Sequence, residues 1–126
     1  MKKIVISLVL LLFIGGMYAV VPVDVFYFHY TRRCTTCKAV ESETLNALQQ
    51  LYKKQIEAGV LKFTSVNLDE KSSEQIAEKC KADGQSLLVV SGKKRVDLTN
   101  TAFMYATNKP EKLKLELKKS IDPLLK

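Results

Sequence analysis

Two cysteines separated by two residues, Cys34 and Cys37, constrain the fold of this chain more than any other feature. They lie between a strand-like run, Val23 to Tyr30, and a helix-like run that begins near Lys38. At the start of a helix, unpaired backbone N–H groups and the positive end of the helix dipole favour a thiolate over a thiol. The position therefore predicts a reactive dithiol that can close into a disulfide and exchange it with another protein.

Two arginines directly precede this pair. Arg32 and Arg33 add positive charge at the same place. Each unit by which a pKa falls corresponds to about 1.36 kcal/mol in favour of the charged form. We expect both arginines to tune the Cys34 thiolate, and the alternative interpretation is that they are solvated loop charges.

The first residues have the pattern of an export signal. Lys2 and Lys3 precede residues 4–21, a stretch of apolar or small residues without charge. This stretch is longer than the usual signal core of about 7 to 15 residues and about as short as a spanning helix can be. Ala19 supplies the small residue that cleavage requires, so this segment could be either cleaved or retained. We predict a signal peptide or membrane anchor in residues 1–21, and an uncleaved form would tether the protein through residues 4–21.

Export would place the rest of the chain in the periplasm or cell envelope. In such an oxidising or redox-managed compartment, a dithiol can cycle or persist as a disulfide. Residues 22–126 provide enough chain for one domain with one hydrophobic core. We therefore predict a single exported domain, with or without an N-terminal anchor.

The basic charge of the chain does not indicate a nucleic-acid partner. The formal charge of +7 falls to +5 when residues 1–19 are removed, because Lys2 and Lys3 are the charged residues there. The densest basic runs, 93–95 and 112–119, have no accompanying aromatic-rich RNA motif or Cys/His finger. We interpret them as solvated lysines.

The remaining sequence predicts alternating strands and helices. Apolar residues on both faces of the first strand indicate a central strand that is covered on each side. Ser72 followed by Gln75 resembles a capping box at a short helix. The alternation of strands and helices requires the first two strands to pair in parallel, whereas the short link at Ser91 to Lys93 indicates an antiparallel hairpin of the last two strands. The predicted strands are 23–30, 61–68, 86–90 and 94–98, and the predicted helices begin near 38, 72, 100 and 110.

This order of elements, with Cys-x-x-Cys directly after the first strand, resembles the thioredoxin-like family over roughly residues 23–126. The resemblance implies an α/β fold, a three-layer sandwich with a mixed central sheet flanked by helices, here preceded by an apolar signal or anchor helix. It also implies a thiol–disulfide oxidoreductase without a dissociable cofactor. Cys34 resembles the attacking cysteine and Cys37 the resolving one. The implied partners are protein thiols and disulfides, and a redox protein that recycles the pair.

The chain departs from the family pattern at the substrate-docking position. Thioredoxin-like proteins usually place a cis-proline before the third strand, where Ser86 stands here. A cis bond before a residue other than proline costs about 2.5 to 4 kcal/mol, so we predict a trans bond between Gln85 and Ser86. These two residues remain the expected substrate-docking residues.

Two further departures concern charge. Phe28 stands where the family often has a buried acid, which leaves His29 and Glu41 as the nearest ionisable residues in the sequence. Arg33 replaces the aromatic residue that commonly precedes the first cysteine. The surface next to the first cysteine is therefore more cationic and would favour a partner with an acidic surface. The alternation of His29 along the strand predicts a histidine in the core or at its rim.

The sequence is also compatible with other functions of the cysteines. The pair could reduce or oxidise its partners, and a more stable Cys34 thiolate would favour oxidation. Alternatively, the fold could be a non-catalytic interaction module that binds through Tyr30 to Cys37. Cys80 is predicted to be a small buried hydrophobe, with a regulatory thiol or intermolecular bridge as alternatives. Together with His29 these cysteines could in principle bind zinc or copper, but they lack the paired spacing of a structural zinc site, and we predict no metal.

Overall fold

The computed structural model describes residues 21–126. The predicted signal peptide or anchor, apart from Val21, lies outside the described residues. Within residues 21–126, no helix is both long and apolar enough to cross a membrane.

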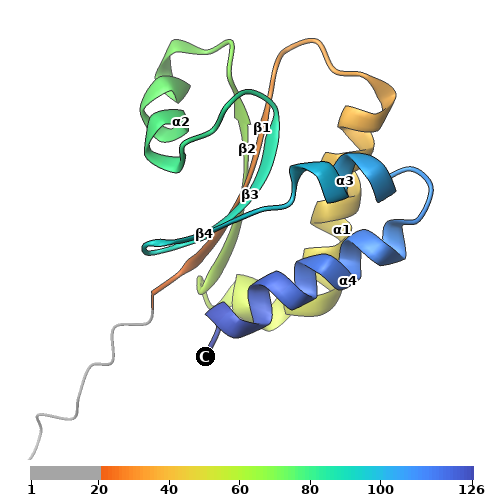
Figure 1. Ribbon diagram of the computed structural model, residues 1–126. Coiled ribbons are helices and arrows are strands. Elements are labelled where there is room, and N and C mark those ends of the chain that lie inside the picture. The colour runs from red at the N-terminus through yellow and green to blue at the C-terminus, as the bar shows by residue number, and fades with distance from the viewer. Residues whose placement is uncertain (1–20) are drawn as a thin grey trace, which may run out of the picture.

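A four-stranded mixed sheet forms the centre of the molecule (Figure 1). Its strands are β1 Val23–His29, β2 Leu61–Asn67, β3 Ser86–Ser91 and β4 Lys94–Asp97, in the order β2-β1-β3-β4. β1 pairs in parallel with β2 and antiparallel with β3, and β3 pairs antiparallel with β4. The predicted parallel pairing and the antiparallel hairpin at one edge are therefore confirmed.

Helices cover both faces of this sheet. They are α1 Thr35–Glu57, α2 Glu74–Cys80, α3 Thr99–Tyr105 and α4 Pro110–Ile121, with the 3₁₀ turns η1 Lys71–Ser73 and η2 Asp122–Leu124. α1, α3 and α4 lie on one side of the sheet, and α2 lies on the other (Figure 1). Pro110 occupies the first turn of α4, as predicted, because its missing N–H is not needed there.

The predicted capping box before α2 is wrong. The 3₁₀ turn η1 precedes α2, so the helix itself begins at Glu74. The hydroxyl group of Ser73 donates its hydrogen bond back to the carbonyl of Glu70 at 2.6 Å, and no side chain caps α2. The Ser73 hydroxyl therefore bonds within the turn η1 and does not cap α2.

The central strand β1 explains why the core has two halves. Val25 and Tyr27 belong to the cluster that includes side chains of α1, α3 and α4. Phe26 and Phe28 belong to a smaller cluster beneath α2. Alternate side chains of a strand point to opposite faces, so a strand covered on both sides carries apolar residues on both faces. This mixed α/β sheet with helices fits a thioredoxin-like fold.

The pairing of β1 also positions the candidate site. β1 ends at His29, and the chain then runs directly through the two cysteines into α1. In the antiparallel pairing, Phe28 near the end of β1 lies opposite Ser86 at the start of β3. The cysteines and the loop before β3 therefore meet at the same end of the sheet, although about 50 residues separate them in sequence.

Candidate redox site

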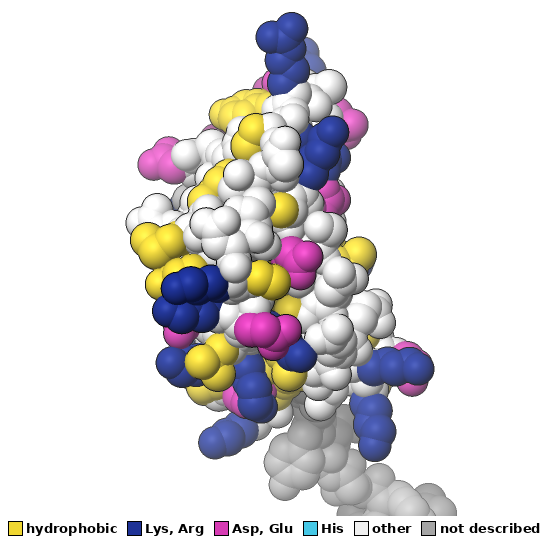
Figure 2. Space-filling view, turned by 90° about the vertical axis from the view of Figure 1, so that its right-hand side faces the viewer, with side chains coloured by type: hydrophobic (Ala, Val, Ile, Leu, Met, Phe, Trp, Pro, Cys, Tyr) yellow, Lys and Arg dark blue, Asp and Glu magenta, His cyan; other side chains and the backbone are white. Residues whose placement is uncertain are grey.

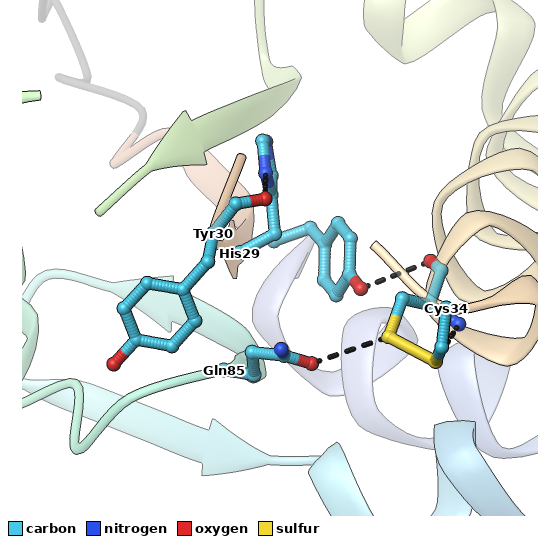
Figure 3. The surroundings of a disulfide bond; sticks show 6 residues. His29, Tyr30, Cys34 and Gln85 are labelled. Carbon is cyan, nitrogen blue, oxygen red and sulfur yellow. Dashed lines mark hydrogen bonds between the residues drawn. A yellow bond between two sulfur atoms is a disulfide. The ribbon is translucent and has the colours of Figure 1, made fainter. Parts of the chain in front are cut away.

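Cys34 and Cys37 form a disulfide, with their Cα atoms 5.0 Å apart (Figure 3). The two residues differ in accessibility: Cys34 is exposed, whereas Cys37 is only 4% exposed. One sulfur can therefore be reached by another protein while its partner is held inside. This asymmetry is compatible with disulfide exchange, whose rate depends on access to the sulfur that is attacked.

The start of α1 holds Cys34 in a position that favours its ionised form. Cys34 is the N-cap residue, and its Sγ accepts a hydrogen bond from the backbone N–H of Cys37 at 3.1 Å. The first turn of α1 contains no acidic residue. A hydrogen bond to the sulfur and the positive helix end both favour thiolate once the disulfide opens.

Two side chains contact Cys37 from other elements. The hydroxyl of buried Tyr27 donates a hydrogen bond to the carbonyl oxygen of Cys37 at 2.9 Å. Burial raises the pKa of Tyr27, so this hydroxyl stays protonated and can donate at neutral pH. The amide oxygen of Gln85 lies 3.4 Å from Cys37 Sγ, where it can accept a hydrogen bond from the reduced thiol (Figure 3).

Tyr27 is a site residue that the sequence interpretation missed. Its alternation with Val25 predicted only that it would be buried on that face of β1. Phe28, at the family's acid position, lies with the cluster under α2, on the other side of the sheet. The side of β1 that faces the cysteines thus presents a phenol to Cys37.

The two arginines before the disulfide occupy different environments. Arg32 is exposed to solvent. Arg33 forms an ion pair with Glu41, in the second turn of α1, and both side chains are partly buried. The carboxylate compensates part of the positive charge that Arg33 brings to Cys34. Thiolate tuning by Arg32 and Arg33 stays a prediction.

The loop before β3 brings Gln85, rather than Ser86, to the disulfide. Residues 21–126 contain no cis peptide bond, so the Gln85–Ser86 bond is trans, as predicted. The Ser86 hydroxyl donates to the carbonyl of Gly84 at 3.0 Å and is used within its own loop. Gly84 has a φ of 89°, a conformation that glycine adopts without strain. Substrate docking by Gln85 and Ser86 stays a prediction.

A hydrogen-bond network fixes the segment between β1 and Cys34. The carboxylate of Asp69 accepts a 2.7 Å hydrogen bond from the backbone N–H of Thr31. The amide of Asn67 donates to the Thr31 hydroxyl at 3.0 Å and its oxygen accepts from the N–H of Asp69. The bonds from Thr31 lower the pKa of Asp69. The end of β2 therefore anchors the approach to the disulfide.

The remaining predicted candidates lie away from the two sulfurs. His29 is buried, and its Nδ1 lies 3.0 Å from the carbonyl of Tyr30, as expected of a core histidine. Tyr30 is 40% exposed and points away from the disulfide (Figure 3). Cys80 is a buried free cysteine in the cluster under α2, and burial raises its pKa. Its predicted burial is confirmed.

Comparisons with known proteins add information on the fold alone. No protein-family model matches the chain, and no curated protein is similar enough in sequence to count as a relative. One similar solved structure is described as "Structure of a malarial protein", with 19% sequence identity and a TM-score of 0.50. The alignment covers 79% of this chain and 98% of that one. Fold and site together define an α/β protein whose Cys-x-x-Cys disulfide is compatible with a redox role.

Proposed function

We propose that this protein is a thioredoxin-like thiol–disulfide oxidoreductase that acts on other proteins. The observation that carries the proposal is the pairing of exposed Cys34, at the start of α1, with buried Cys37. Supporting observations are the mixed sheet and the placement of the disulfide directly after the central strand.

In the reducing direction, the Cys34 thiolate attacks one sulfur of a partner disulfide. A bond forms between Cys34 and that sulfur, and the other partner sulfur leaves as a thiolate that takes up a proton. Cys37 then loses its proton and attacks Cys34 Sγ, which releases the first partner sulfur as a second thiol. The partner gains two electrons and two protons, and the Cys34–Cys37 disulfide is left.

The surroundings of Cys37 suit the second step. Tyr27 holds the carbonyl of Cys37, and Gln85 offers an acceptor to its thiol, so the sulfur stays within reach of Cys34. Both contacts are uncharged at neutral pH. A neutral environment avoids the like-charge repulsion that a carboxylate would exert on the Cys37 thiolate.

The same steps run backwards when the disulfide oxidises a partner dithiol. A separate redox protein must then restore the starting state of the pair. The Arg33–Glu41 ion pair limits how strongly the loop stabilises the Cys34 thiolate, and a less stable thiolate lowers the reduction potential. Equilibration with glutathione would give this potential and therefore the direction of electron flow.

We also propose that the protein is exported to the periplasm or cell envelope. The support is the sequence pattern of residues 4–21, behind Lys2 and Lys3. An exported location would match a disulfide in the resting state of the site. N-terminal sequencing of the mature protein would distinguish a cleaved signal peptide from a retained anchor.

Reduction of insulin disulfides by dithiothreitol, with and without the protein, tests the proposed activity. We expect the protein to accelerate reduction and the Cys34→Ser variant to lose this effect. Cys80→Ser is the matched control, because Cys80 lies on the other side of the sheet and should not contribute. Equal rates for wild type and Cys34→Ser would instead favour the non-catalytic interaction module, for which the use of Ser86 within its own loop is the supporting observation.

A further inference from the structure

Five basic side chains gather around the tip of the β3–β4 hairpin, at the opposite end of β1 from the disulfide. We call this set the hairpin patch. Its members, all exposed, line one hollow of the surface: Lys79, Lys81, Lys93, Lys94 and Arg95. Arg95 ties the hairpin to the end of α2, since its guanidinium donates to the carbonyls of Cys80 at 2.8 Å and Lys81 at 3.0 Å. The patch is therefore built from two elements held together.

The charge of the hairpin patch is not compensated by ion pairs. Among residues 21–126, no carboxylate lies within salt-bridge distance of these five side chains. One acid, Asp24, lines the adjoining hollow. The face on the side of α3 and α4 differs, because basic and acidic side chains are interspersed there (Figure 2). On α4, Lys118 pairs with Asp122 and Lys119 with Glu116.

The described chain begins beside this patch. A Cβ atom placed on Gly92, at the hairpin turn, would lie 3.5 Å from a methyl group of Val21. Val21, which is 53% exposed, lines a hollow together with Gly92, Lys93 and Lys94. Val21 is also the last residue of the uncharged apolar stretch 4–21. The stretch that would enter a membrane therefore joins the domain next to its unpaired cations.

We propose that the hairpin patch lies on anionic phospholipid headgroups when residues 4–21 hold the chain on a membrane. Basic side chains close to an anionic membrane surface each favour binding by about fivefold, and the attraction acts over roughly a Debye length. Because Val21 ends the apolar stretch and lies beside Gly92, a membrane surface at Val21 would lie within about a Debye length of the patch. Lipid binding by this surface does not require the thiol chemistry of the site.

This orientation has a consequence for the disulfide. β1 runs from Val23, at the patch end, to His29, next to the cysteine loop. Seven residues in a strand span about 20 Å. Docking of the hairpin patch on lipid would turn Cys34 away from the membrane, toward partners in the surrounding solution.

Hydrogen exchange of the full chain in lipid nanodiscs tests the proposal. Nanodiscs of phosphatidylcholine alone are compared with nanodiscs that also contain phosphatidylglycerol. We expect amides of residues 91–95 to exchange at least about fivefold more slowly in the anionic nanodiscs, and amides of residues 31–37 to exchange equally in both. The difference should disappear at about 0.5 M NaCl, where the Debye length is only about 4 Å.

Charge reversal gives the matched comparison. The variant Lys93→Glu with Lys94→Glu should lose the slower exchange. The variant Lys71→Glu with Lys109→Glu should keep it, because these exposed lysines carry the same charge away from the hairpin. Exchange that is equal in the two lipids, or slowed equally in both double variants, would overturn the proposal. So would a chain that does not stay on the nanodiscs, or slowing by a DNA duplex but not by anionic lipid.

Discussion

The buried hydroxyl of Tyr27 donates a hydrogen bond of 2.9 Å to the backbone carbonyl oxygen of Cys37. This bond joins the central strand to the first turn of α1. It fixes Cys37, the proposed resolving cysteine, through its backbone and does not involve its sulfur. Tyr27 thus connects the fold of the sheet with the geometry of the site.

We predict that Tyr27→Phe lowers the free energy of unfolding by about 0.5–1.5 kcal/mol, because a buried hydrogen bond is lost while the ring still fills its place. Urea unfolding of the oxidised protein measures the change. Tyr30→Phe is the control, since Tyr30 is 40% exposed, and it should leave stability unchanged within error. Equal effects of the two substitutions would show that the Tyr27 bond contributes nothing specific.

The contact between Gln85 and Cys37 predicts a change in the resolving step. Gln85→Glu would place a carboxylate close to Cys37 Sγ, which is 3.4 Å from the present amide oxygen. A like charge at this distance raises the thiol pKa by about 1–3 units, so less thiolate is available to attack Cys34. We expect a mixed disulfide between Cys34 and glutathione to decay at least about tenfold more slowly at neutral pH.

The pH dependence of that decay checks the explanation. In Gln85→Glu the rate should rise with pH over a range shifted upward from that of the wild type. Gln85→Leu, similar in size and without charge, should remain close to the wild-type range. If Gln85→Glu resolves the mixed disulfide as fast as the wild type at every pH, Gln85 does not face the resolving thiol in the reduced protein.

The elements that the sequence predicts well are those defined by local patterns. β1 is apolar on both faces and is the buried central strand, and the short link after Ser91 does form a hairpin. As predicted, the two cysteines lie at the start of a helix, Cys34 as its cap and Cys37 in its first turn, although the helix begins at Thr35 and not near Lys38. Periodicity and turn length carry this information because each depends on neighbouring residues only.

The contacts that shape the site depend on residues distant in sequence. Gln85 reaches Cys37 across 48 positions, and no local pattern indicates which residue of that loop would do so. Likewise, Glu41 could be identified as a nearby ionisable group, but its ion pair with Arg33 requires the helix start and the loop to be placed in space. The capping box at Ser72 failed because a preceding 3₁₀ turn moved the helix start.

The Arg33–Glu41 ion pair leads to a prediction on the reactivity of Cys34. Glu41→Gln removes the compensating carboxylate, so the full charge of Arg33 acts on the sulfur. We expect the pKa of reduced Cys34 to fall by about one unit at most, and the disulfide to become more oxidising. Thiolate absorbance against pH and equilibration with glutathione measure the two changes.

Glu43→Gln is the matched control for this substitution. It removes the same charge two positions further along α1, and among residues 21–126 Glu43 forms no ion pair with Arg33. It should shift the Cys34 pKa less than Glu41→Gln. Equal shifts in the two variants would mean that net charge, and not this ion pair, controls the thiolate.

The bond between Thr31 and Asp69 predicts how acid affects the cysteine loop. Hydrogen bonds from Thr31 lower the pKa of Asp69 below its ordinary value of 3.8. A group whose pKa is lowered by folding stabilises the folded state above its unfolded pKa, and this contribution is lost as the pH falls through the lower folded value. The loop should therefore be held firmly at neutral pH and released only in acid.

Exchange of the Thr31 amide, corrected for the intrinsic dependence on pH, reports this bond directly because that N–H donates to Asp69 at 2.7 Å. In the wild type we expect protection at neutral pH and its loss below about pH 3.8, as the carboxylate is protonated. Asp69→Ala should expose the amide at every pH, whereas Asp83→Ala, at an exposed acid outside the network, should behave as the wild type. Protection that persists in Asp69→Ala would show that other contacts hold the approach to Cys34. Loss of protection with Asp69→Ala, together with faster reaction of the disulfide with glutathione, would identify the end of β2 as the element that positions Cys34.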